Sequence, residues 1–162
     1  MTKEELKDLL DYDPDTGKFY WVVAKSRSIK VGDMAGTRHK QGYNQIRING
    51  RLYLAHRLAW LYMTGNMPDS LIDHEDGDVS NNAWSNLRAS SSLENNYNSK
   101  MQKSNTSGVK GVSWCNTHKR WVAKIGVGGK SILIGYFKDI GQAEVETRKA
   151  REKLHGEFAN HG

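Results

Sequence analysis

The sequence has little of what stabilises extracellular or membrane proteins. Cys115 is the single cysteine among 162 residues, which excludes a disulfide framework and a zinc site built from cysteines. No apolar run approaches the roughly 20 residues that cross a bilayer, because His56 and Arg57 interrupt the most apolar stretch, 54–63. The first residues also lack the basic-then-apolar order of a signal peptide. We therefore expect a protein of the reducing cytoplasm, without a membrane partner.

Acidic residues are scarce in the C-terminal part of the chain. Residues 1–96 carry 12 basic and 13 acidic side chains, a net charge of −1, whereas residues 97–162 carry 12 basic and 5 acidic side chains, a net charge of +7. This division predicts a polyanion-binding module behind a near-neutral one, although a run of charge is also typical of a solvated face. Apolar residues make up 37% and tryptophans number 5, which favours folded cores over disorder.

Turn signals divide the first part of the chain into short elements. A helix is expected over 4–10, strands over 18–23, 43–48 and 51–54, a polar loop over 24–40, and a helix from Ala55 onward. Residues 99–108 are polar and predict a linker. Strands over 109–114, 120–127 and 130–137 then precede a helix over 142–154.

Acidic residues and asparagines are unusually dense over 69–98. One interpretation is purely structural: a solvated acidic turn with asparagine caps. An EF-hand calcium loop is excluded, because the phasing of the aspartates is wrong and no glutamate ends the loop. The third interpretation is a nuclease site with one metal ion: Ile72-Asp73-His74 would end a strand, 75–85 would form a loop, and Asn86-Leu87-Arg88 would return as a strand.

Four polar residues of that segment fit roles in phosphodiester hydrolysis. Asp73 and the amide of Asn95 offer the oxygen ligands that a hard divalent cation prefers. His74 is suited to accept a proton from the attacking water, and Asn86 would orient the imidazole or hold the loop. Ser91 and Glu94 have capping-box spacing, so Asn95 is expected near the start of a helix.

These motifs resemble the HNH homing endonucleases of phages and introns over roughly residues 1–98. The resemblance rests on Ala55-His56-Arg57-Leu58-Ala59-Trp60, on Asp73-His74 with Gly77, Asp78, Asn82 and Asn86-Leu87-Arg88, and on Asn95. It implies a ββα-metal fold, a general base at His74, metal ligands at Asp73 and Asn95, and a structural or orienting role for Asn86. The final motif position is Asn95 instead of histidine, and zinc-ribbon cysteines are absent. We expect His56 to hydrogen-bond toward the site, and Asn82 either to contact the catalytic residues or, as we favour, to be only part of the loop.

The C-terminal strands are expected to present two unlike faces. Arg120, Val122, Lys124 and Gly126 share one face by alternation, which is basic, while the other face is apolar and should pack on the helix. A sheet of this kind fits the DNA major groove.

Residues 108–159 are similar to the APETALA-type domain of plant transcription factors, in Gly108-Val109-Lys110-Gly111-Val112-Ser113-Trp114, Trp121 to Ile125 and Ile134 to Phe137. The similarity implies DNA contacts from Lys110, Ser113, Trp114, Arg120, Lys124 and Lys130. Ser113 and Gly126 depart from it, since plant relatives often have arginine there. Trp114 is expected either to stack on DNA or to join the core.

The sequence thus predicts an α+β protein with a nuclease domain over 1–98, a linker over 99–108, and an APETALA-type DNA-binding domain over 109–160. The first is of the ββα-metal (His-Me finger) type, and the last has a three-stranded antiparallel sheet plus one helix. The expected function is cleavage of double-stranded DNA with one Mg²⁺ or Mn²⁺ ion per active site and no small-molecule cofactor. The protein would be a phage-encoded monomer or weak dimer in the bacterial host. The alternatives are a non-catalytic DNA-binding regulator with a degenerate HNH fold and a basic protein that binds RNA.

Overall fold

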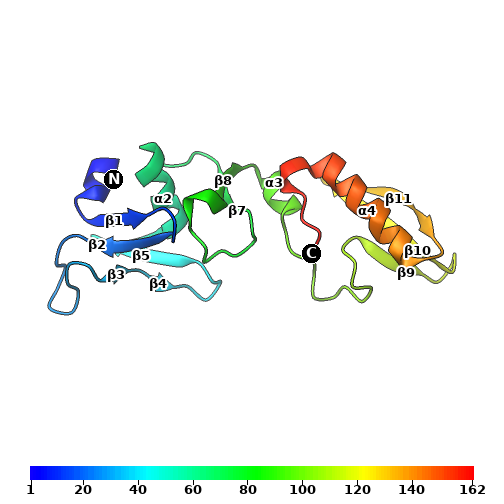
Figure 1. The fold of residues 1–162 in the computed structure, drawn as a ribbon, viewed down its shortest axis with the longest axis horizontal. Helices are drawn as coiled ribbons and strands as arrows, with labels where there is room; N and C mark the ends of the chain where they lie inside the picture. The colour runs from blue at the N-terminus through cyan, green and yellow to red at the C-terminus, as the bar shows by residue number, and fades with distance from the viewer. The chain divides into compact units, whose positions relative to one another are not determined.

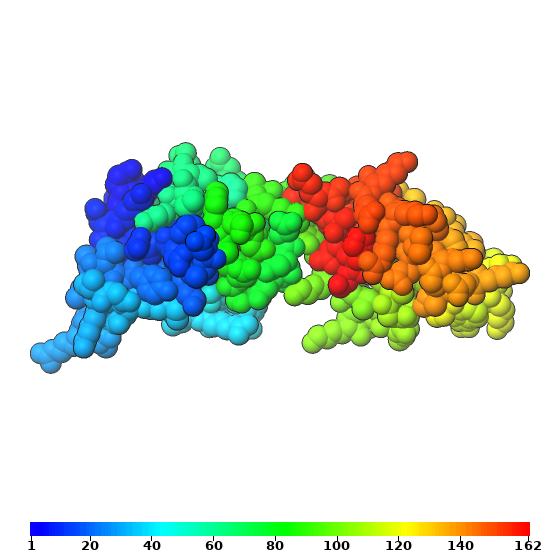
Figure 2. All heavy atoms as spheres, viewed as in Figure 1, coloured from blue at the N-terminus to red at the C-terminus, as the bar shows by residue number.

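Small antiparallel sheets joined by short helices build the protein, as shown by a computed structural model that describes residues 1–162 (Figure 1). The chain divides into two compact units, Met1–Ser90 and Ser91–Gly162. Figure 2 shows the heavy atoms of the same chain, with the first unit coloured from blue to green. The mixture of helices with antiparallel sheets confirms the predicted α+β class.

The first unit contains two three-stranded sheets and a final two-stranded one, with strand orders β1-β2-β3, β4-β5-β6 and β7-β8. Its elements are α1 (Lys3–Lys7), β1 (Leu10–Asp13), β2 (Lys18–Trp21), β3 (Met34–Ala35), β4 (Thr37–Arg38), β5 (Asn44–Ile48), β6 (Arg51–Leu54), α2 (Ala55–Thr64), β7 (Leu71–His74), the 3₁₀ turn η1 (Trp84–Asn86) and β8 (Leu87–Ser90).

Turn residues set the boundaries of these elements. Asn49 and Gly50 both have positive φ, as the tight hairpin between β5 and β6 requires. Helix α2 follows β6 directly and ends at Gly65, which is left-handed. The inner face of α2 then packs Leu58 and Leu61 into a core with Phe19 and Ile46, each at most 2% exposed.

The second unit is a three-stranded antiparallel sheet with one long helix on it. Its elements are α3 (Ser92–Tyr97), β9 (Val112–Cys115), β10 (Arg120–Val127), β11 (Lys130–Phe137), α4 (Ile140–His155) and the 3₁₀ turn η2 (Gly156–Phe158), with strand order β11-β10-β9. Helix α4 lies over this sheet (Figure 1). Val112, Ala123 and Ala143 form the buried centre between them.

The two faces of the sheet follow from its register. Val112 and Trp114 pair with Ala123 and Trp121 on the helix-facing side. The opposite face holds Ser113, Arg120 and Lys124 by alternation. Val122, which the alternation also puts on this face, is buried there, in register with Ser113 and Tyr136.

Several predicted boundaries are wrong. The first helix ends at Lys7, because β1 begins at Leu10. The expected loop over 24–40 contains β3 and β4, which are two-residue strands held by the longer strands β2 and β5 beside them. Strand β9 begins at Val112 instead of residue 109, since Gly111 has positive φ. Helix α3 and residues 99–108 belong to the second compact unit; the assignment of 1–98 and 109–160 to two functional domains stays a prediction.

The core of the first unit should depend strongly on α2. We expect Leu58→Ala to lower the free energy of unfolding by about 2–5 kcal/mol, because a fully buried leucine leaves a cavity. The matched variant Leu52→Ala, at a site 51% exposed, should change it by less than about 0.5 kcal/mol. Urea unfolding followed by backbone amide signals of residues 1–90 measures both, and equal effects would contradict this description of the core.

Candidate active site

Strand β7 carries the two central residues of the candidate site at its end. Asp73 pairs in register with Arg88 of β8, and His74 pairs with Leu87. Both Asp73 and His74 are only 4% exposed. The predicted strand, loop and returning strand are therefore present, although Asn86 closes the turn η1 and β8 begins at Leu87.

The imidazole of His74 is held by a loop residue. His74 Nε2 lies 3.1 Å from Asn82 Oδ1 within the interior, and Asn82 is 1% exposed. Of the two roles that the sequence left open for Asn82, a contact to the catalytic residues and a place in the loop only, the geometry supports the first. Sequence spacing gave no signal for this contact, because the loop folds back over eight residues to reach the histidine.

A second histidine packs against the first. The rings of His56 and His74 meet edge to face with centroids 5.1 Å apart, and Tyr43 stacks at a tilt on His56. His56 Nδ1 is buried without a hydrogen-bond partner, so it does not make the hydrogen bond toward the site that the sequence suggested. Burial lowers the pKa of His56 to about 4, and the nearby His74 and Arg57 add to this effect. A neutral ring at pH 7 follows.

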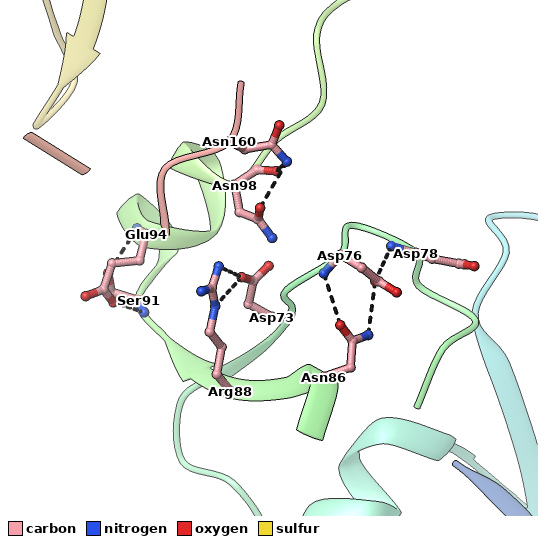
Figure 3. Close-up of polar contacts among 9 residues, drawn as sticks. All are labelled: Asp73, Asp76, Asp78, Asn86, Arg88, Ser91, Glu94, Asn98 and Asn160. Carbon is pink, nitrogen blue, oxygen red and sulfur yellow. Dashed lines mark hydrogen bonds and ion pairs between the residues drawn. The ribbon is translucent and has the colours of Figure 1, made fainter. Parts of the chain in front are cut away.

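Asn86 holds the loop rather than the imidazole (Figure 3). Its amide donates to Asp76 Oδ1 at 3.0 Å and to the Asn81 carbonyl at 2.8 Å. Its Oδ1 accepts from the backbone N–H of Asp76 at 3.0 Å. Of the two roles left open for Asn86, the geometry supports the second.

Asp73 forms a buried ion pair. Its Oδ2 accepts from Arg88 Nε at 2.9 Å and from Arg88 Nη2 at 2.8 Å (Figure 3). One guanidinium thus balances the charge of a carboxylate that lies almost wholly inside the protein.

Asn95, the other predicted metal ligand, belongs to the second unit. It lies on α3, whose capping box of Ser91 and Glu94 is confirmed: Ser91 Oγ accepts from Glu94 N at 3.2 Å, and Glu94 Oε2 accepts from Ser91 N at 2.7 Å (Figure 3). Asn95 is exposed in the first turn.

The assignment of Asp73 and Asn95 as ligands of one metal ion stays a prediction, because the two residues belong to different units. Asp73 supplies a carboxylate and Asn95 an amide oxygen, the ligand types that Mg²⁺ binds. No three histidine, cysteine, aspartate or glutamate side chains gather into a group that could hold a metal.

The predicted DNA-contacting residues do not all share one surface. Ser113, Arg120 and Lys124 lie on the face away from α4. By register, Trp114 and Lys130 lie on the opposite face, paired with Trp121 and Val127.

Two of these residues also make contacts within the protein. Trp114 meets the edge of Trp121 at 5.1 Å and stays 45% exposed. Lys110 donates to the carbonyls of Ser99 and Asn160. Burial, and to a smaller extent the positive charge of the nearby Arg151, lowers the pKa of Lys110 to about 8.

Comparison with known proteins places this site in a family. A family model described as HNH endonuclease matches residues 53–97. Protein 3.8 of Escherichia phage T7 is 36% identical over 105 residues, which cover 64% of this chain and 86% of that protein. The uncharacterized HNH endonuclease L560 of Acanthamoeba polyphaga mimivirus is 30% identical over 151 residues, or 93% of this chain and 70% of that protein.

A solved structure of DNA binding and cleavage by the HNH homing endonuclease I-HmuI is also similar, with 26% identity and a TM-score of 0.38. The match covers 51% of this chain and 47% of that one. The mimivirus relative shows the family, and the chain belongs to the HNH endonucleases. None of its helices has the length and apolar character needed to span a membrane.

The buried His56 should make the first unit less stable in acid. Its pKa is about 4 when folded, against 6.5 ordinarily, so below pH 6.5 the unfolded chain binds more protons and stability falls as the pH drops toward 4. The full effect is about 3 kcal/mol. In His56→Phe, which keeps a ring, the loss between pH 7 and pH 4.5 in urea unfolding should be smaller by about this order. Equal losses in the two proteins would contradict the assignment.

Proposed function

We propose that this protein is a metal-dependent DNA endonuclease of the HNH homing type, which hydrolyses a phosphodiester with His74 as the general base. The observation that supports this most is the buried His74, hydrogen-bonded to Asn82 and adjacent in the chain to the paired carboxylate of Asp73. An imidazole held in place by a hydrogen bond is suited to accept a proton from an attacking water.

In this proposal Asp73 and Asn95 would hold one divalent ion, Mg²⁺ or Mn²⁺. Such an ion, when bound, stabilises the negative charge that develops on the phosphate and the leaving oxygen. Arg88 orients the Asp73 carboxylate by two hydrogen bonds to the same oxygen. Asn86 keeps the loop between β7 and β8 closed through Asp76 and Asn81.

The second unit would act as an APETALA-type DNA-binding domain. Ser113, Arg120 and Lys124, which share the face away from α4, would contact duplex DNA from that face. Trp114 and Lys130, the other predicted contacts, lie on the opposite face of the sheet. Lys110 is engaged with two backbone carbonyls, so its part would be to position the chain before β9. Binding through phosphates would weaken as salt rises.

A monomer with one such site would cut one strand, and double-strand cleavage would need a second engagement or a weak dimer. The place of action would be the cytoplasm of a bacterial host. The alternative function is a non-catalytic DNA-binding regulator, since the name of the relative Protein 3.8 gives no activity. A protein that binds DNA but does not cleave it would favour this alternative.

His74→Ala should abolish cleavage without abolishing DNA binding. Loss of a general base lowers the rate by about 10²–10⁴-fold, whereas the sheet of the second unit is untouched by the change. Conversion of supercoiled plasmid in Mg²⁺ and a gel shift in EDTA measure the two properties. His39→Ala, a histidine outside the site, should cleave like the wild type. Cleavage by His74→Ala at the wild-type rate would overturn the assignment of the base.

Asp73→Asn should also lose cleavage, with weaker metal binding. The amide keeps the size of the side chain and an oxygen for Arg88, so the fold should persist while the ligand charge is removed. Calorimetric titration with Mn²⁺ measures the affinity, and Asp69→Asn, an exposed aspartate before β7, serves as the control. An unchanged titration for Asp73→Asn would exclude Asp73 as a ligand.

A further inference from the structure

Asn82 makes its contacts to His74 with a defined orientation of the amide. Asn82 Nδ2 lies 3.3 Å from the carbonyl oxygen of Ser80, which can only accept a hydrogen bond. The nitrogen of the amide is therefore directed to Ser80 and the oxygen to the imidazole, where Oδ1 is 3.1 Å from His74 Nε2. Since an amide oxygen can only accept, His74 Nε2 must carry the proton of this hydrogen bond.

This assignment decides which nitrogen of the neutral ring is basic. With the proton on Nε2, the lone pair of the neutral imidazole lies on Nδ1. A general base needs this tautomer to be held in place, because the other tautomer presents an N–H where the water proton has to be accepted.

The N-terminal hairpin contacts the backbone of Asn82, whose side chain contacts His74. The hydroxyl of Tyr12 donates to the backbone carbonyl of Asn82 at 2.7 Å. Burial, with a smaller effect of Asp13, raises the pKa of Tyr12, so the donor stays protonated. Next to Asn82, the N–H of Trp84 donates to the Pro14 carbonyl at 2.8 Å.

The turn of this hairpin also leaves no space for a side chain. A Cβ on Gly17 would lie 2.2 Å from the carbonyl carbon of Asn82 and 2.3 Å from Ala83 N. Gly17 has a φ of +69°, and the turn is fixed by Asp13, whose carboxylate accepts from Thr16. Residues 12–17 therefore pack directly against the backbone of Asn82.

We propose that Asn82 is the positioning residue that holds His74 as its Nε2–H tautomer. We also propose that Tyr12 and the turn 13–17 fix the backbone of Asn82, so that its amide oxygen stays within hydrogen-bond distance of His74. Resting on the proposed function, this makes His74 Nδ1 the atom that accepts the proton of water. The first hairpin therefore stabilises the site, although its residue Tyr12 lies 70 positions before Asn82 in the chain.

Steady-state cleavage of plasmid DNA in Mg²⁺ by full-length variants tests the role of Asn82. Asn82→Ala should lower kcat by about 10–100-fold with KM for DNA within about twofold of wild type, because Asn82 acts through His74 and not on DNA. Asn82→Asp, which keeps an acceptor oxygen, should recover most of the lost kcat. A kcat for Asn82→Ala within twofold of wild type would overturn the proposal, as would an Asn82→Asp protein that folds and is as slow as Asn82→Ala.

The hairpin is tested by a matched pair of glycine changes. Gly17→Ala should lower kcat, because the new methyl group displaces the Asn82 backbone. Gly50 also has positive φ, at +81°, but no atom lies within 4 Å of a Cβ placed there. Gly50→Ala therefore carries the same backbone strain without the clash and should keep the wild-type kcat. Equal effects of the two changes would overturn the role of the hairpin.

A spectroscopic measurement separates this proposal from the proposed function. In ¹⁵N-labelled wild-type protein, long-range ¹H–¹⁵N correlations of neutral His74 should show a protonated Nε2 and an unprotonated Nδ1. A proton on Nδ1 would overturn the proposal. If the wild type fails to cleave DNA, the nuclease function fails, while the correlation pattern still decides whether Asn82 fixes the tautomer.

Discussion

The antiparallel pairing of β7 with β8 is the constraint on which the candidate site depends. It places Asp73 opposite Arg88 and His74 opposite Leu87, so that a charge pair and a histidine lie next to each other on one short strand. The loop between the two strands has to bring its ends close together. Asn86, at the end of the loop, fixes this conformation with three hydrogen bonds to Asp76 and Asn81. A two-stranded ribbon is marginally stable alone, and here Leu87 joins the core of the first unit.

Burial determines the electrostatics around this ribbon. The carboxylate of Asp73 lies inside the protein beside the guanidinium of Arg88, whereas His56 has no such partner and is neutral. The two histidines in contact therefore differ in their surroundings: the amide of Asn82 holds His74, while His56 fills space between the rings of Tyr43 and His74. A polar group held by several elements at once is well suited to chemistry that needs fixed geometry.

Local signals in the sequence predicted much of this arrangement. The hairpin at Asn49-Gly50, the capping box of Ser91 and Glu94 and the strand ending at His74 each depend on residues a few positions apart. The contact of Asn82 with His74 could not be predicted in that way, because it depends on Tyr12 and Gly17 from a distant hairpin. In the sheet of the second unit, strand alternation placed Arg120 and Lys124 correctly on one face. The positions of Lys130 and Trp114 depend on pairing with Val127 and Trp121, which the sequence alone does not fix.

The most direct test of the account is incubation of the purified protein with supercoiled plasmid at low salt, in Mg²⁺, in Mn²⁺ and in EDTA, beside DNA of a phage or bacterial host. We expect open-circular or linear product in the presence of either metal ion and none in EDTA. A clear gel shift with no cleavage of any of these DNAs under all three conditions would contradict a nuclease and would favour a DNA-binding regulator built on the HNH fold.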